Sequence, residues 1–80
     1  MSREEVYDKL NEIFRDVFDD DSIQLTDATT ADDIDDWDSL EQITIINGCE
    51  KKFNVKFNMM EVTSLHNVGE MVDMICSKLE

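Results

Sequence analysis

Residues 36–40, with the sequence D-W-D-S-L, lie between a long acidic segment and an apolar pattern with helical spacing. Ser39 and Gln42 have the S-x-x-Q spacing of a capping box, which begins a helix. Asp38 and Glu41 offer the same arrangement one residue earlier. Either start places the Ser39 hydroxyl in the first helical turn, beside backbone N–H groups that have no partner within the helix. Those donors and the positive end of the helix dipole suit an attached phosphate.

The segments on both sides of this stretch also have helical patterns. Their apolar residues recur at helical spacing, and the chain has no proline and only two glycines, which favours helices over a multi-turn β architecture. The predicted helices cover about 3–18, 39–53, about 58–63 and about 68–79, and a long loop covers 19–38. The sequence therefore predicts an all-α fold: a four-helix bundle of three longer helices and one short helix, in a single domain over 1–80.

The spacing also predicts which side chains face the core. In the helix over 39–53 the inward residues are Ile45, Ile46, Cys49 and Phe53. Leu40 and Ile43 fall nearer the other side, where an exposed apolar pair is a contact surface. The short helix is expected to pack Met59, Met60 and Val62 inward. The long loop is expected to lie across the helices through the apolar anchors Ile23, Leu25, Ala28, Ile34 and Trp37.

The formal net charge is -13, which restricts the possible partners. Nucleic acid is not expected, because its phosphates need a basic footprint, and an anionic membrane surface is not expected for the same reason. Basic patches on other proteins complement this charge, whose self-repulsion favours a monomer. We expect a cytoplasmic protein, since no apolar run approaches membrane-spanning length and the first residues are already polar and helical in pattern. Cys49 and Cys76 are expected to be reduced thiols.

The tripeptide D-S-L at 38–40, in a chain of this length and pattern, resembles the acyl carrier protein family. The apolar positions that accompany it are Trp37, Ile43, Ile46 and Phe53. The resemblance covers nearly the whole chain, from about Val6 to Leu79. It implies that Ser39 carries a 4′-phosphopantetheine arm, derived from coenzyme A, through a phosphodiester. The implied function is to hold acyl groups as thioesters and to present them to enzymes of fatty-acid, polyketide or related biosynthesis.

The resemblance also implies partners. One is a phosphopantetheinyl transferase, and the others are acyl-transferring or acyl-activating enzymes with basic docking patches. Asp38 and Glu41 are expected to meet basic groups on these enzymes. Leu40 and Ile43 are expected to supply apolar contact beside them.

Other readings of the same residues remain open. A serine at a helix start is often only a cap. Catalysis is not expected: Ser39 lacks the G-x-S-x-G context of a nucleophile elbow, and His66 is the single histidine. The aspartates near Ser39 do not fit a calcium-loop pattern, so no metal site is predicted. The alternative functions are an aminoacyl or peptidyl carrier of a specialised pathway and a small acidic protein-interaction module without a prosthetic group.

Overall fold

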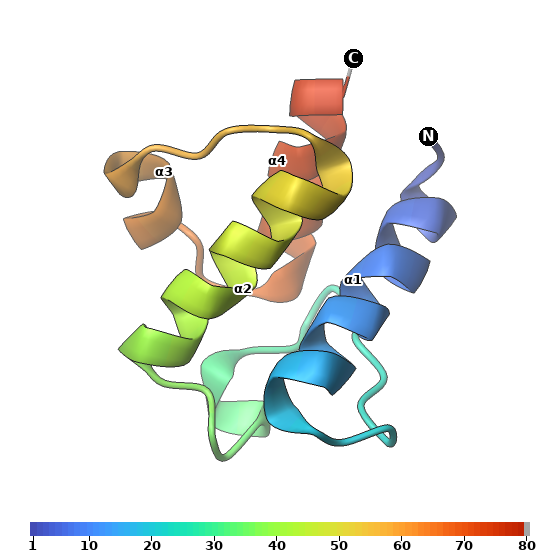
Figure 1. The fold of residues 1–80 in the computed structure, drawn as a ribbon. Coiled ribbons are helices and arrows are strands. Elements are labelled where there is room, and N and C mark those ends of the chain that lie inside the picture. Colours follow the sequence, from blue (N-terminus) through green and yellow to red (C-terminus); the bar gives the residue numbers. More distant parts are fainter. Residues whose placement is uncertain (80) are drawn as a thin grey trace.

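The computed structural model describes residues 1–79, and its regular elements are all helical (Figure 1). They are α1 (Arg3–Phe18), the short 3₁₀ turn η1 (Ala31–Asp33), α2 (Ser39–Phe53), α3 (Met59–Thr63) and α4 (Val68–Leu79). Three long helices and one short helix agree with the prediction from the sequence. Among the described residues, no helix is both long and apolar enough to cross a membrane.

Capping residues explain why the two longest helices begin and end where they do. Ser2 and Glu5 form a reciprocal capping box at the start of α1, and Asp19 ends that helix in the left-handed conformation with φ 51°. Asp38 caps α2, and Asn54 ends it with φ 56°. Aspartate and asparagine tolerate this conformation better than most side chains, because their short polar groups bond locally.

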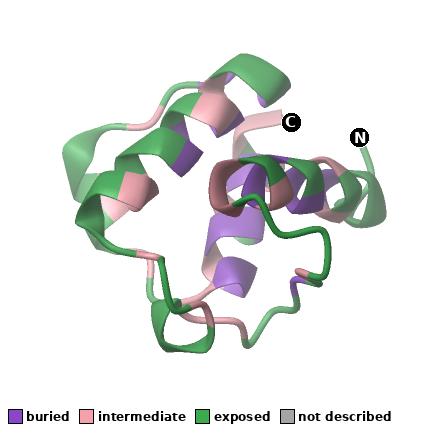
Figure 2. Ribbon diagram, turned by 60° about the horizontal axis from the view of Figure 1, so that its bottom comes forward, coloured by how far each residue is buried: buried purple, intermediate pink, exposed green. Residues whose placement is uncertain are grey.

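The core lies where α1, α2 and α4 face one another (Figure 2). Helix α1 packs against both α2 and α4. The predicted inward residues of α2 are all buried: Ile45, Ile46, Cys49 and Phe53. The largest fully buried side chains of the other two helices are Phe14, Leu10, Met71 and Ile75.

Polar contacts from α1 hold the long loop against the helices. The Leu25 N–H donates to the side-chain oxygen of buried Asn11 over 2.9 Å, and the Arg15 Nε donates to the Ile23 carbonyl over 2.8 Å. Leu25 is buried and Ile23 is half-buried, as the sequence predicts. Ala28 was expected to be an anchor as well, but it is exposed. Its segment is held by hydrogen bonds of the backbone and of neighbouring side chains, so its methyl group stays outside.

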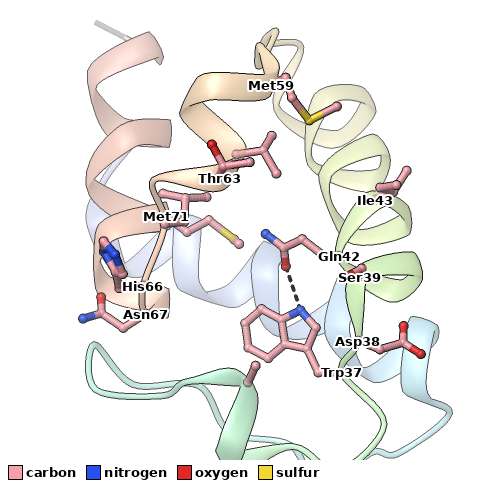
Figure 3. A pocket seen from close by; sticks show the side chains of 13 residues that line it. Trp37, Asp38, Ser39, Gln42, Ile43, Met59, Thr63, His66, Asn67 and Met71 are labelled. Carbon is pink, nitrogen blue, oxygen red and sulfur yellow. Dashed lines mark hydrogen bonds between the residues drawn. The ribbon is translucent and has the colours of Figure 1, made fainter.

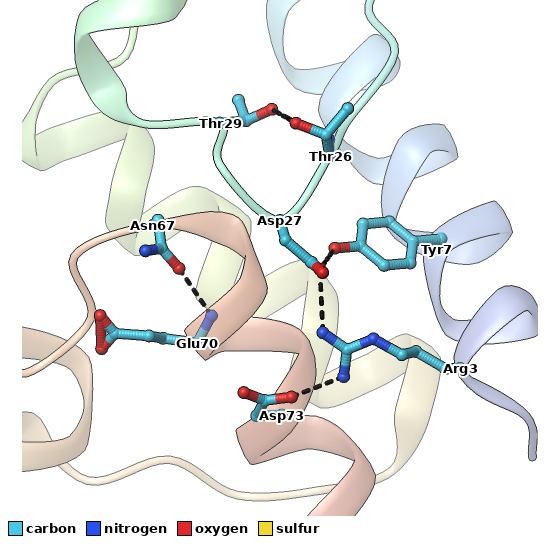
Figure 4. Close-up of polar contacts among 8 residues, drawn as sticks. All are labelled: Arg3, Tyr7, Thr26, Asp27, Thr29, Asn67, Glu70 and Asp73. Carbon is cyan, nitrogen blue, oxygen red and sulfur yellow. Dashed lines mark hydrogen bonds and ion pairs between the residues drawn. The ribbon is translucent and has the colours of Figure 1, made fainter.

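Two backbone hydrogen bonds join the loop to the start of α4, near the polar contacts of Asp27 that Figure 4 shows. The Val68 N–H donates to the Thr29 carbonyl over 2.8 Å, and the Gly69 N–H donates to the Asp27 carbonyl over 3.0 Å. The Asp27 carboxylate accepts from the Tyr7 hydroxyl and, over 2.8 Å, from Arg3. These two donors hold the Asp27 pKa below its usual range. We call these contacts of residues 27 and 29 with α1 and α4 the Asp27 clasp.

Helix α3 lies at the edge of α2 rather than on the core, which contradicts the expectation for its methionines. Met59 and Met60 are 71% and 82% exposed, and only Val62 is partly buried. Met59 and Val62 line a cavity between α2 and α3, and Met60 lies at the surface. Lys78 ties this helix to α4 through a 2.8 Å ion pair with Glu61.

Candidate functional site

Ser39 is the first residue of α2, and the cap is the residue before it. The Asp38 carboxylate accepts from the Glu41 N–H over 2.9 Å, and the Asp38 carbonyl accepts from the Gln42 N–H over the same distance. The alternative in which Ser39 itself caps the helix is therefore wrong. Because Asp38 performs the capping, the exposed Ser39 hydroxyl is not needed to hold the helix start.

The backbone around Ser39 offers free donors. Within residues 1–79, neither the Ser39 N–H nor the Leu40 N–H has an acceptor at hydrogen-bonding distance. These are the first two positions of a helix of 15 residues, where unpaired N–H groups and the helix dipole favour an anion. A phosphate ester on the Ser39 oxygen suits this environment, so the site fits the phosphodiester of a phosphopantetheine arm.

Apolar side chains flank Ser39 on the same helix. Leu40 is 69% exposed and Ile43 is 53% exposed, in contrast to the buried residues on the other side of α2. Asp38 is exposed as well, and Glu41 is half-exposed. The structure thus brings the four predicted docking residues together around Ser39, on the first turns of α2. Their role in docking stays a prediction.

Beside Ser39 opens a cavity of about 430 Å³ between α2, α3, the start of α4 and the end of the long loop (Figure 3). Its volume lies toward the lower end of the roughly 300–1,000 Å³ typical of small-molecule pockets. The large apolar side chains that line it are Trp37, Ile43, Met59, Val62, Leu65 and Met71. A smaller cavity of about 160 Å³ adjoins it and shares Ile43, Met59 and Val62. Ser39 lies at the edge of the larger cavity.

Gln42 and Trp37 form one wall of this cavity. The Trp37 indole N–H donates to the Gln42 side-chain oxygen over 2.7 Å (Figure 3). The indole also packs edge-on against the ring of Phe14, with 5.0 Å between ring centroids. The sequence suggested Gln42 as a capping partner of Ser39, and that was wrong, because its side chain bonds Trp37 instead.

Two other groups of residues lack the features of a reactive site. Among the described residues, no cluster of three or more histidine, cysteine, aspartate or glutamate side chains has the geometry to hold a metal ion. Burial raises the pKa of the Cys49 thiol to about 12, so this thiol is protonated at neutral pH. Ser39 and the cavity beside it are therefore the best candidate for a functional site.

Comparison with known proteins agrees with this geometry. A family model described as a phosphopantetheine attachment site matches residues 8–75. The solution NMR structure of a holo acyl carrier protein from Geobacter metallireducens is 48% identical, with a TM-score of 0.86. The match covers 91% of this chain and 84% of that one. The comparison with curated proteins gave no match. The matching fold, family model and sequence identity show that the chain belongs to the acyl carrier protein family, with a phosphopantetheine prosthetic group.

Proposed function

We propose that Ser39 bears the 4′-phosphopantetheine arm and that the protein presents acyl groups to the enzymes of a biosynthetic pathway. The single observation that carries this proposal is the position of Ser39. Its hydroxyl is exposed, it stands at the first position of α2 beside two free N–H groups, and it borders an apolar cavity. When bound, the arm supplies a terminal thiol on which an acyl group is held as a thioester.

The helix start offsets the electrostatic cost of adding a phosphate to this chain. The net charge is already -13, so a further negative group meets repulsion over most of the surface. At Ser39 the helix dipole and the free N–H groups of residues 39 and 40 act in the opposite direction. The nearest carboxylate, on Asp38, already accepts the Glu41 N–H. We infer that the first turn of α2 is the place on this surface that best accepts the phosphodiester.

The cavity supports carriage in a second way. Its apolar walls, which include Leu65 and Met71, give an acyl chain a place to leave water while it stays attached near Ser39. The exposed Met59 on α3 lines the same space and has the flexible side chain that adapts to different contents. An acyl chain sheltered in this way keeps its reactive thioester away from water while the carrier is not bound to an enzyme.

The surface around Ser39 suits enzymes with basic patches. The carboxylates of Asp38 and Glu41 attract arginine and lysine groups, and the exposed Leu40 and Ile43 add apolar contact. The proposed partners are a phosphopantetheinyl transferase and acyl-transferring or acyl-activating enzymes, which act on a monomeric carrier.

The proposal assigns no catalysis to the chain itself, because carriage requires only an anchor and a docking face. It also places the carrier in the cytoplasm. Cys49 and Cys76 are both free, which agrees with a compartment where thiols stay reduced.

Intact mass spectrometry tests the proposal. The apo protein is incubated with coenzyme A and a broad-specificity phosphopantetheinyl transferase. We expect a gain of one phosphopantetheine, absent in Ser39→Ala and retained in Ser64→Ala, which alters an exposed serine near the end of α3. Circular dichroism establishes that both variants are folded. No gain with transferases of differing specificity would refute the proposal and favour an acidic interaction module without a prosthetic group.

A further inference from the structure

Gln42 lines the cavity beside Ser39, and hydrogen-bond chemistry fixes the orientation of its amide. An indole N–H only donates hydrogen bonds, so the atom of Gln42 that lies 2.7 Å from the Trp37 Nε1 must be the amide oxygen. The amide NH₂ of Gln42 is therefore on the other side of the group. Figure 3 shows this nitrogen directed away from the indole, toward Met71 across the cavity.

The amide nitrogen is free to donate. Within residues 1–79 it has no acceptor at hydrogen-bonding distance, and it is accessible to solvent rather than fully buried. Two other polar side chains along the wall do not offer a donor in this place. The Thr63 hydroxyl donates to the Met60 carbonyl over 3.1 Å, and Asn67, whose side-chain oxygen accepts from the Glu70 N–H over 2.8 Å, has its NH₂ directed away from Gln42 (Figure 3). The Gln42 NH₂ is thus a positioned donor in a mainly apolar cavity.

We propose that Gln42 is a specificity-determining residue, and that the cavity favours a short acyl group with a hydrogen-bond acceptor, such as a hydroxyl or keto oxygen near the thioester, over an all-hydrocarbon group. This inference rests on the proposed function of Ser39. It names the chemistry of the cargo that the site shelters best.

The physical reason is the desolvation of the donor. A hydrocarbon chain that fills the cavity displaces the water on the Gln42 NH₂ and leaves the donor unpaired. A group of the same length with an oxygen at the right place displaces the water and accepts the hydrogen bond itself. The hydrogen bond to Trp37 keeps the Gln42 amide from rotating by 180°, because the rotated amide would place its NH₂ against the indole N–H.

Two matched acyl groups test the inference: butanoyl and 3-hydroxybutanoyl, each loaded onto the apo protein from its coenzyme A thioester. The first readout is the rate at which hydroxylamine cleaves the thioester. Its nitrogen attacks the thioester carbonyl, which forms a hydroxamate and releases the arm's thiol. Each rate is divided by that of the same acyl group on free pantetheine, so that intrinsic reactivity cancels. The second readout is the NMR shift of the Gln42 side-chain NH₂ and of the Trp37 indole N–H.

Three variants separate the donor from its surroundings. Gln42→Leu removes both amide groups with little change in volume. Gln42→Glu keeps an oxygen for the Trp37 indole but replaces the NH₂ by a second acceptor. Gln24→Glu makes the same chemical change on an exposed residue of the long loop, away from the cavity. Circular dichroism reports whether each variant keeps the native fold.

In the wild type we expect the 3-hydroxybutanoyl thioester to be cleaved about five- to tenfold more slowly than the butanoyl thioester, after normalisation. This preference should persist in Gln24→Glu and vanish in both Gln42 variants, and only the hydroxylated cargo should shift the Gln42 NH₂ signal. Equal protection of the two cargoes in the wild type, or the same preference in Gln42→Leu, overturns the inference. Either result leaves the attachment to Ser39 intact, because loading is established separately by the gain in mass.

Discussion

Gly69→Ala is expected to destabilise the protein through the contact between the long loop and α4. Gly69 is the second residue of α4, and a Cβ added there would lie 2.9 Å from the Asp27 carbonyl oxygen and 3.1 Å from the Asp27 Cα. Real Cβ atoms essentially never come as close as 2.9 Å to another atom, and both of these neighbours are backbone atoms. The loop must therefore move away from the helix.

The displacement has an approximate magnitude. It weakens the hydrogen bonds from the Gly69 N–H to Asp27 and from the Val68 N–H to Thr29. Each such bond contributes about 0.5–1.5 kcal/mol, so the loss is about 1–3 kcal/mol. Alanine recovers up to about 1 kcal/mol through its better helix propensity. We expect a net loss of about 1–2 kcal/mol, or a melting temperature lower by about 5–15 °C for a domain of this size.

Thermal unfolding followed by circular dichroism measures this effect, and Gly48→Ala provides the matched control. Gly48 is also helical, but a Cβ there would meet only the Ile13 side chain, at 3.1 Å, and not the backbone of a loop. That variant should lie within about 1 kcal/mol of the wild type. In Gly69→Ala, hydrogen exchange of the Val68 amide should also accelerate. If Gly69→Ala is as stable as Gly48→Ala, the two backbone hydrogen bonds between the Asp27 clasp and α4 do not contribute the expected free energy of unfolding.

Three further predictions concern docking and titration. Glu41→Lys should slow loading by the transferase more than Glu4→Lys, since both lie in the first turn of a helix and only Glu41 is near Ser39; equal rates would contradict docking through α2. Burial and the hydrogen bond to the Asp27 carboxylate raise the Tyr7 pKa from 10.0 to about 12. Because the unfolded chain releases this proton at a lower pH than the folded protein, the free energy of unfolding should fall as the pH rises from 10 to about 12. An absorbance titration with the same phenolate midpoint in native and denatured protein would contradict this. At pH 8 a maleimide should modify half-buried Cys76 well before buried Cys49, as mass spectrometry of the digested protein would show; comparable rates would contradict the burial.

The helices could be predicted because their signals are local. The Ser2 capping box, the Asp38 cap and the apolar spacing act over three or four residues, and nothing in the tertiary structure opposes them. The inward face of α2 followed from the same spacing, and so did the exposure of Leu40 and Ile43.

The placement of the long loop could not be predicted, because its contacts join residues far apart in the sequence. Asn11 is separated from Leu25 by 14 positions, and Arg3 from Asp27 by 24. Nothing near Asn11 marks it as a buried polar residue, since its partner comes from the loop. The prediction for Met59 and Met60 was wrong for a related reason. Apolar character predicts burial only if a core lies opposite, but Met59 borders a cavity and Met60 lies at the surface.

The candidate site was found in part. The spacing around Ser39 identified the helix start, but two caps were possible, and the choice depended on which side chain turned toward the backbone. The hydrogen bond between Trp37 and Gln42 favours Asp38 as the cap, because it engages the Gln42 side chain that would otherwise complete a Ser39 capping box. A tryptophan five residues before a glutamine is not a recognised signal, and so the cavity wall could not be predicted from the sequence.

The most direct test of the central claim is to locate the modification on the chain. After loading with coenzyme A and a transferase, the protein is digested and the modified peptide is sequenced by tandem mass spectrometry. The account predicts phosphopantetheine on Ser39, the exposed serine at the start of α2, in every modified peptide. Modification of Ser2, Ser22, Ser64 or Ser77, with Ser39 left free, would contradict it.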